Sequence, residues 1–178
     1  GVVEPTCRRA VLMTQNKRVG LIATAASVRS GAYEAALRRL DPEVTVFSRA
    51  CPLFVPLAEA GRIRRGDVVI ETVAREYLEP LKATGVDTLI LGCTHYPLLT
   101  DIIRDIMGPE VTLVSAGEES AFELKRLLKA DRLRAEETWE GGVDFYVSDR
   151  PEDFEHIASV FLGENLCHSA ERINIEQY

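Results

Sequence analysis

Short apolar runs alternate with longer amphipathic stretches along this chain. The runs are rich in β-branched residues and mostly apolar throughout, which is typical of strands buried on both faces of a parallel sheet. They predict strands at residues 18–23, 44–48, 87–91, 111–114 and 143–147. The stretches between them predict helices at residues 5–15, 28–40, 66–84, 97–107, 117–130 and 151–162. This alternation predicts an α/β fold with an open, mainly parallel sheet and helices on both faces.

The composition fits a soluble globular protein, because 46% of the residues are hydrophobic and 28% are charged. The formal net charge of −7 argues against nucleic-acid binding, since no surplus of cations is available to displace counterions. A basic group at Arg62, Arg64 and Arg65 is interpreted as a solvated loop. No apolar run approaches the roughly 20 residues of a membrane span, and the N-terminus lacks the apolar stretch of a signal peptide.

The cysteines lie at positions 7, 51, 93 and 167, and no two of them form a C-x-x-C pair. This spacing favours neither structural zinc nor a disulfide framework, so we expect a reducing, cytoplasmic setting. The segment Arg132–Gly142 is polar and ends in a glycine pair, and it predicts a connection between lobes.

Polar side chains gather after several predicted strands. In open α/β sheets, ligands bind at the carboxyl ends of the strands, so these residues are candidates for a site. They comprise Thr24, Ser27, Cys51, Cys93, Thr94, His95 and Ser115.

Cys93 is the best placed of these candidates. It follows a buried strand and precedes a helix predicted to begin near Pro97, whose N-terminus would favour a thiolate. Gly92 would let the backbone turn tightly. Thr94 can offer a hydroxyl and an N–H to a carboxylate, and His95 is close enough in sequence to assist proton transfer.

Two other interpretations of Cys93 stay open at this point. It could be a small buried hydrophobic residue, as free cysteines often are. With His95 it could also hold a metal, but Cys167 and His168 would have to complete the site. No spacing signature supports that arrangement.

The segment Leu89–Leu99, LILGCTHYPLL, resembles the glutamate racemases of the aspartate/glutamate racemase family. The segment Cys51–Glu59, CPLFVPLAE, is similar to the family's stretch that ends in an active-site glutamate. Val19–Tyr33 resembles its strand, hydroxyl-rich turn and following helix, and residues 145–163 resemble its C-terminal part. Together these segments cover nearly the whole chain in the family's order.

The resemblance implies racemisation of L-glutamate to D-glutamate without a cofactor, metal or pyridoxal phosphate. In this family, one cysteine thiolate removes the α-proton and a second thiol returns a proton from the opposite face. The resemblance further implies a cytoplasmic homodimer that supplies D-glutamate for peptidoglycan synthesis. Cys93 matches the second catalytic cysteine, His95 its assisting histidine, and Glu59 the active-site glutamate. Substrate-binding roles are implied for Thr94, Thr24 and Ser27.

The family's Cys-Asn-Thr and Asp-Ser-Gly motifs do not occur in this sequence. The chain opens at GVVEP, which resembles family sequence just beyond the first cysteine. We therefore expect residues 1–116 to form a complete lobe carrying the Cys93 half-site. Residues 117–178 would form the C-terminal part of a second lobe, whose N-terminal part is absent. This polypeptide alone would then have little or no racemase activity.

Two alternative functions remain at the level of sequence. The first is a racemase or decarboxylase of the same superfamily that acts on aspartate, a hydantoin or an arylmalonate. Rates on aspartate and glutamate would decide that question. The second is a non-catalytic, truncated binding lobe that sequesters an amino acid or a protein. The missing motifs fit this second alternative, and the coding region upstream of Gly1 would discriminate.

Overall fold

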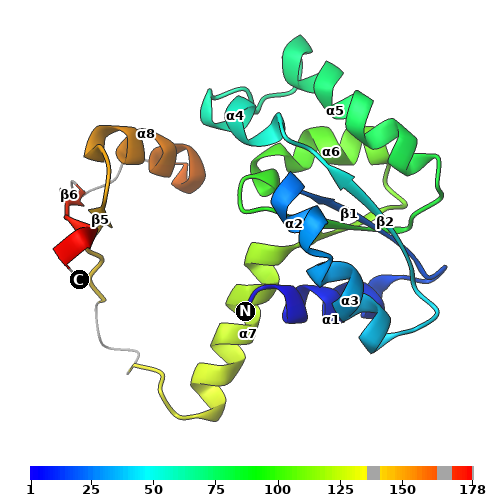
Figure 1. Ribbon diagram of the computed structural model, residues 1–178, viewed down its shortest axis with the longest axis horizontal. Helices are drawn as coiled ribbons and strands as arrows, with labels where there is room; N and C mark the ends of the chain where they lie inside the picture. Colours follow the sequence, from blue (N-terminus) through cyan, green and yellow to red (C-terminus); the bar gives the residue numbers. More distant parts are fainter. Residues whose placement is uncertain (136–140, 164–169, 178) are drawn as a thin grey trace. The chain divides into compact units, whose positions relative to one another are not determined.

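The structure, a computed structural model, describes residues 1–135, 141–163 and 170–177 in two compact units, Gly1–Leu133 and Arg134–Tyr178 (Figure 1). The first unit contains, in chain order, α1 (Val3–Met13), β1 (Arg18–Ala23), α2 (Ala25–Ser30), α3 (Ala32–Leu40), β2 (Thr45–Ala50), α4 (Phe54–Glu59), α5 (Val68–Lys82), β3 (Thr88–Gly92), the 3₁₀ helix η1 (Tyr96–Leu99), α6 (Thr100–Met107), β4 (Thr112–Ser115) and α7 (Ala116–Ala130). The second unit contains β5 (Tyr146–Val147), α8 (Pro151–Leu162), β6 (Glu171–Arg172) and the 3₁₀ helix η2 (Ile175–Gln177).

The first unit is built on a parallel sheet with the strand order β2-β1-β3-β4. Because the strands are parallel, their carboxyl ends lie at one edge of the sheet. This sheet and its covering helices confirm the predicted α/β class. The strand β1 coincides with its predicted span, and the other three strands of this sheet each begin one residue later than expected.

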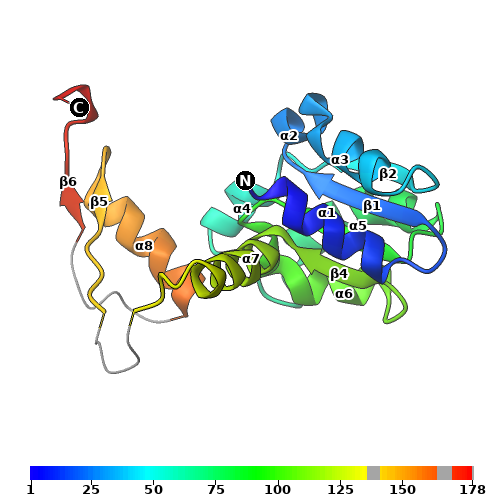
Figure 2. The same cartoon turned by 90° about the horizontal axis from the view of Figure 1, so that it is seen from below.

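Both faces of the two central strands are buried, which explains their continuous apolar runs. Leu21 of β1 and Ile90 of β3 pack into a core with α1 and α3, whereas Ile22 and Leu91 pack into a second core with α5 and α6. Figure 1 shows α5 and α6 on one side of the sheet and α1 and α3 on the other, and Figure 2 looks onto the side that α1 covers. Successive side chains of a strand point to opposite faces, so strands sandwiched in this way need apolar residues at every position.

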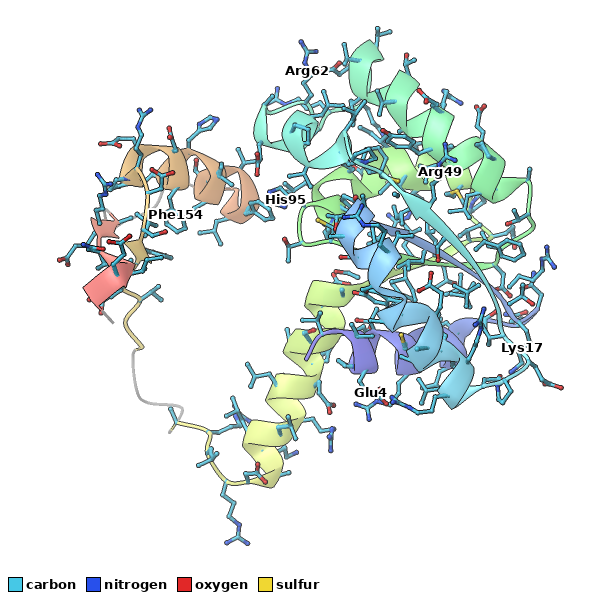
Figure 3. The ribbon with its side chains drawn as sticks, viewed as in Figure 1. Glu4, Lys17, Arg49, Arg62, His95 and Phe154 are labelled. Atoms are coloured by element: carbon cyan, nitrogen blue, oxygen red, sulfur yellow. The ribbon has the colours of Figure 1, made fainter. Side chains whose placement is uncertain are left out.

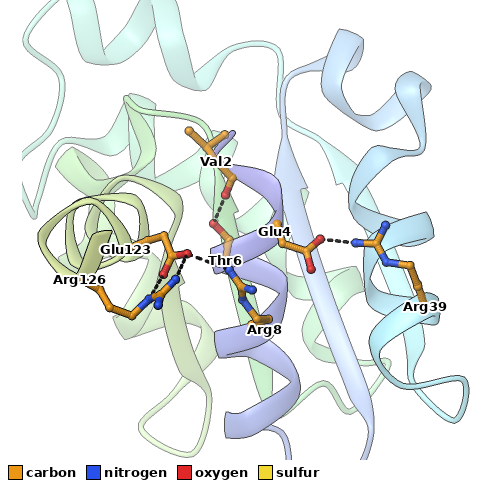
Figure 4. Close-up of polar contacts among 7 residues, drawn as sticks. All are labelled: Val2, Glu4, Thr6, Arg8, Arg39, Glu123 and Arg126. Carbon is orange, nitrogen blue, oxygen red and sulfur yellow. Dashed lines mark hydrogen bonds and ion pairs between the residues drawn. The ribbon is translucent and has the colours of Figure 1, made fainter. Parts of the chain in front are cut away.

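The helix α1 is linked by ion pairs to helices on either side of it (Figure 4). Glu4 pairs with Arg39 of α3, and Arg8 pairs with Glu123 of α7 at 3.2 Å. These side chains are partly or largely exposed, so the pairs contribute little to the stability of the fold. The fully buried Cys7 on the inner face of α1 shows that apolar packing fixes this helix.

The structure corrects the predicted helices at three places. The span 28–40 is divided at Gly31, whose φ of 64° ends α2 in the left-handed conformation that glycine favours. The span 97–107 begins with the 3₁₀ turn η1, and its α-helical part starts only at Thr100. The short helix α4 was not predicted, because six residues are too few to show a helical period in their apolar positions.

The second unit is small and contains a short parallel pair, in which Tyr146 of β5 lies opposite Glu171 of β6. The predicted strand at 143–147 is therefore strand only in its last two residues. The helix α8 matches its predicted span and begins with Pro151, whose missing N–H is tolerated there. The predicted connection at 132–142 spans the division between the units, and its residues 136–140 lie outside the described residues.

The assignment of residues 117–178 to a second lobe of a longer protein stays a prediction. Within the part of the chain that the structure describes, no helix is long and apolar enough to cross a membrane.

Candidate functional site

The carboxyl ends of three adjacent strands bring candidate side chains to one edge of the sheet. The last residues of β1, β2 and β3 are in register, so Thr24, Cys51 and Cys93 follow them at this edge. Ser115 ends the neighbouring strand β4, where its hydroxyl accepts a hydrogen bond from the Glu118 N–H and caps α7. The register thus places two thiols and two hydroxyls along one line, as expected from the parallel topology.

Cys93 is partly exposed and packs against the border of the core formed with α5 and α6. The preceding residue, Gly92, lies so close to β1 that a Cβ atom would stand 3.0 Å from Leu21 Cδ1 and 3.1 Å from the Ile22 carbonyl oxygen. Glycine is therefore required for close packing between strands, rather than for the tight turn inferred from sequence. This packing fixes the backbone from which Cys93 projects.

Two other cysteines are sealed inside the protein. Cys7 and Cys51 are fully buried, and burial raises the pKa of each thiol to about 12. Their sulfurs lie 3.7 Å from the carbonyl oxygens of Tyr33 and Arg49, respectively. Both are held as neutral thiols, because the cost of burying a thiolate outweighs its attraction to Arg39 near Cys7 or to Arg49 near Cys51. Cys167 lies outside the described residues.

Glu59 and His95 lie in contact although they come from different segments. Glu59 ends α4, and His95 (labelled in Figure 3) lies on the segment after β3 that also carries Cys93. The distance from Glu59 Oε1 to His95 Nε2 is 3.1 Å. The Thr94 hydroxyl oxygen lies 3.4 Å from His95 Nδ1. The imidazole side chain is 19% exposed and the carboxylate 41%, so the pair is reachable from solvent.

This geometry suits one tautomer of a neutral His95. The Nε2–H group would donate to the Glu59 carboxylate, which leaves Nδ1 to accept from the Thr94 hydroxyl. Protonation of the ring would convert the same contact into an ion pair. The histidine of this pair follows Cys93 by two residues in the sequence.

The segment after Cys93 differs from the predicted helix start. The Tyr96 N–H donates to the Cys93 carbonyl oxygen at 3.2 Å, and the Leu98 N–H donates to the His95 carbonyl oxygen at 3.1 Å. These bonds form a 3₁₀ turn, which separates Cys93 from the α-helical start at Thr100. A helical turn therefore begins near Pro97 as expected, but it is a 3₁₀ turn, and the α-helix itself begins at Thr100.

Thr24 and Ser27 form a hydroxyl pair next to the Cys93 strand. The Thr24 hydroxyl oxygen caps α2 by accepting from the Ser27 N–H at 3.3 Å, and the two side-chain oxygens lie 3.0 Å apart. Capping holds Thr24 in a single orientation. These hydroxyls can donate to the carboxylate of a bound ligand.

The basic group after α4 is compensated by nearby carboxylates. Arg62 (labelled in Figure 3) lies 3.0 Å from Asp67, and Arg65 lies 2.6 Å from Asp105. All four side chains are partly or largely exposed, in agreement with a solvated loop. Among the described residues, no group of three or more His, Cys, Asp or Glu side chains converges as a metal site would require. The alternative metal ligands Cys167 and His168 lie outside that part of the chain.

The fold and this edge define an α/β domain in which the segment after a parallel strand carries a partly exposed thiol and, two residues further along the chain, the histidine of a carboxylate–imidazole pair. A family model described as Asp/Glu/Hydantoin racemase matches residues 1–121. The chain belongs to this family.

Named relatives are similar over almost all of the chain. It is 46% identical to a glutamate racemase of Geobacter metallireducens over 166 residues, which are 93% of this chain and 61% of the relative. The crystal structure of the glutamate racemase isoform RacE1 from Bacillus anthracis matches with a TM-score of 0.87 at 33% identity, covering 98% of this chain and 63% of that chain. The glutamate racemase from Thermus thermophilus, in complex with beta-chloro-D-alanine, matches with a TM-score of 0.83 at 38% identity, covering 100% of this chain and 63% of that chain. The chain thus spans about three fifths of the length of these relatives.

Proposed function

We propose that this chain supplies one acid–base half of a glutamate racemase, with Cys93 as the group that exchanges the substrate's α-proton. One observation carries the proposal: Cys93 is a partly exposed thiol at the carboxyl edge of the sheet, two residues from the His95–Glu59 pair. The relatives support glutamate as the substrate, since the similar structure from Francisella tularensis, 31% identical, is a glutamate racemase in complex with D-glutamate.

The chemistry needs a base on each face of the α-carbon. The Cys93 thiolate takes the α-proton, and the electron pair of the broken C–H bond passes into the substrate carboxylate as a planar carbanion. A thiol on the opposite face then delivers a proton to the α-carbon and becomes the thiolate. A single fixed base tends to return the proton to the face it left, so one thiol alone gives exchange without inversion. The proposal involves no cofactor.

The other candidate residues take supporting roles. His95 and Glu59 hold a proton beside the thiol and assist its return, as general acid–base pairs do. The substrate carboxylates bind to the hydroxyl groups at the same edge of the sheet. These belong to Thr94, Thr24 and Ser27.

Cys7 and Cys51 are both fully buried and so do not fit the role of the opposing thiol. The family's Cys-Asn-Thr motif, which carries that thiol, does not occur in this sequence. We therefore propose that residues 1–178 alone do not complete racemisation. In the complete protein, the family implies a cytoplasmic homodimer whose D-glutamate product enters peptidoglycan synthesis.

The test is α-proton exchange in deuterium oxide, followed by ¹H NMR and optical rotation, with D- and L-glutamate and with both enantiomers of aspartate. We expect this chain to exchange the α-proton of one glutamate enantiomer without changing its optical rotation. Racemisation of both enantiomers by this chain would contradict the half-site proposal. Faster exchange of aspartate than of glutamate would assign a different substrate, and binding without exchange would favour the non-catalytic lobe.

A further inference from the structure

Tyr96 connects three segments that build the candidate site. Its side chain is 0% exposed, and its hydroxyl donates to the Cys51 carbonyl oxygen at 3.0 Å. Its backbone N–H donates to the Cys93 carbonyl oxygen at 3.2 Å. Tyr96 is thus hydrogen-bonded through its side chain to the residue after β2 and through its backbone to the residue after β3.

The same carbonyl group of Cys51 also fixes the start of α4. It accepts the Phe54 N–H at 3.2 Å in addition to the Tyr96 hydroxyl, so both of its lone pairs are used. The Phe54 ring packs edge-to-face on the Tyr96 ring, with centroids 5.2 Å apart and an interplanar angle of 89°. The helix α4 is therefore held against Tyr96 by a shared acceptor and by ring packing.

These contacts join the two segments that carry Glu59 and His95. Glu59 is the last residue of α4, which Phe54 begins, and His95 is the residue before Tyr96. The 3.1 Å contact between His95 and Glu59 therefore depends on how α4 and the segment after β3 are placed relative to each other. A purely apolar ring could fill the same space, but it could not bond to the Cys51 carbonyl.

We infer that Tyr96 is a positioning residue, whose hydroxyl holds the Cys93–His95 segment in register with α4 and so aligns His95 with Glu59. It does not touch reacting atoms and acts through the pair that it aligns. This inference rests on the proposed function only for its consequence in the reaction. The alignment itself is a property of the fold and can be measured without substrate.

The test is Tyr96→Phe, compared with Tyr77→Phe as a matched control. Tyr77 packs on the same Phe54 ring at 5.3 Å, but its hydroxyl bonds to the Leu53 backbone. Each variant loses one phenol hydroxyl from a single aromatic cluster. Circular dichroism and thermal unfolding establish that each variant folds.

The first readout is the ¹⁵N NMR signals of the His95 ring, assigned with His95→Gln. We expect Tyr96→Phe to shift these signals toward those of Glu59→Gln, and Tyr77→Phe to leave them near the wild-type positions. Unchanged His95 signals in Tyr96→Phe would overturn the inference. Equal shifts in both tyrosine variants would overturn it as well, because the effect would then belong to the whole aromatic cluster.

The second readout is the rate of glutamate α-proton exchange. A misaligned pair lowers kcat rather than substrate binding, so we expect a fall of roughly tenfold to a hundredfold in Tyr96→Phe with KM little changed. An NMR shift accompanied by a normal exchange rate would keep the alignment but refute the role proposed for His95. If Tyr96→Phe does not fold, Phe54→Leu is measured instead, because it removes the ring contact while keeping the hydroxyl bond to the Cys51 carbonyl. We expect the His95 signals of this variant to stay near the wild-type positions. A shift toward those of Glu59→Gln would overturn the inference, because ring packing and not the hydroxyl would then set the alignment.

Discussion

The imidazole of His95 lies 3.1 Å from the carboxylate of Glu59, although the two residues are 36 positions apart in the chain. The contact joins the end of α4 to the segment that carries Cys93. A carboxylate that accepts a hydrogen bond from one ring nitrogen of a histidine keeps the proton on that nitrogen. The other nitrogen is then available to accept a hydrogen bond. Under the proposed function, this pair holds the proton that the Cys93 thiol exchanges.

Removing the carboxylate should disrupt this pair. We expect Glu59→Gln to lower the rate of glutamate α-proton exchange by about a hundredfold, within the range of general acid–base effects. Glu76→Gln, at an exposed position on α5, serves as the control and should exchange at the wild-type rate. Equal rates for Glu59→Gln and the wild-type chain would remove the pair from the mechanism.

The cysteines should differ sharply in reactivity. Burial raises the pKa of Cys7 and Cys51 to about 12, whereas Cys93 is partly exposed. We expect iodoacetamide at mildly alkaline pH to modify Cys93 in the folded chain and to spare the other two until denaturant is added. Peptide mass mapping distinguishes the sites. Rapid modification of Cys51 in the folded chain would contradict its burial.

Asp87 should make the stability of the domain depend on pH. Burial alone would raise the pKa of its carboxyl group, but hydrogen bonds lower it overall. The donors are the Thr14 and Thr88 hydroxyls and the Gln15 and Asn16 N–H groups. The lowered pKa stabilises the folded state fully above the ordinary value of 3.8, and this stabilisation is lost as the pH falls through the lower folded-state value.

The matching substitution is Asp87→Asn. It should cost about 1–3 kcal/mol of unfolding free energy near neutral pH, because several donors lose a charged acceptor. The difference from the wild-type chain should shrink as the pH is lowered through the acidic range. Urea unfolding at a series of pH values measures both effects. A difference that stays constant with pH would show that the Asp87 charge does not stabilise the fold.

Alanine substitutions at two glycines should differ in their effect on stability. A Cβ atom at Gly92 would stand 3.0–3.1 Å from neighbouring atoms of β1, which include backbone, so Gly92→Ala should cost about 1–3 kcal/mol. At Gly117, in the first turn of α7, the nearest atom within reach is Ser115 Oγ at 3.8 Å. Gly117→Ala should therefore be neutral or stabilising by up to about 1 kcal/mol. Thermal unfolding of both variants checks this, and equal destabilisation would contradict the packing argument.

The α/β class was predictable from the sequence because strands covered on both faces must be apolar at every position. The run from Val19 to Ala23 shows this pattern, and it forms β1 as expected. The candidate thiol was found from its place after a strand, a rule that depends only on the parallel topology. Periodicity was less reliable where helices are short, as at α4, and where a helix begins as a 3₁₀ turn, as before Thr100.

The contacts within the site could not be derived from spacing alone. Glu59 was singled out by resemblance, and nothing in the pattern of residues showed that it would meet His95. The role of Tyr96 was also missed, because a buried tyrosine and a buried phenylalanine give the same apolar signal. Only the position of its hydroxyl against the Cys51 carbonyl distinguishes them.

The central claim is that the sulfur of Cys93 exchanges the α-proton of glutamate. The most direct measurement is deuterium incorporation at the α-carbon of D- and L-glutamate by Cys93→Ala and by Cys51→Ala, followed by ¹H NMR under identical conditions. We expect exchange to be abolished in Cys93→Ala and retained in Cys51→Ala. Exchange at the wild-type rate in Cys93→Ala would contradict the claim.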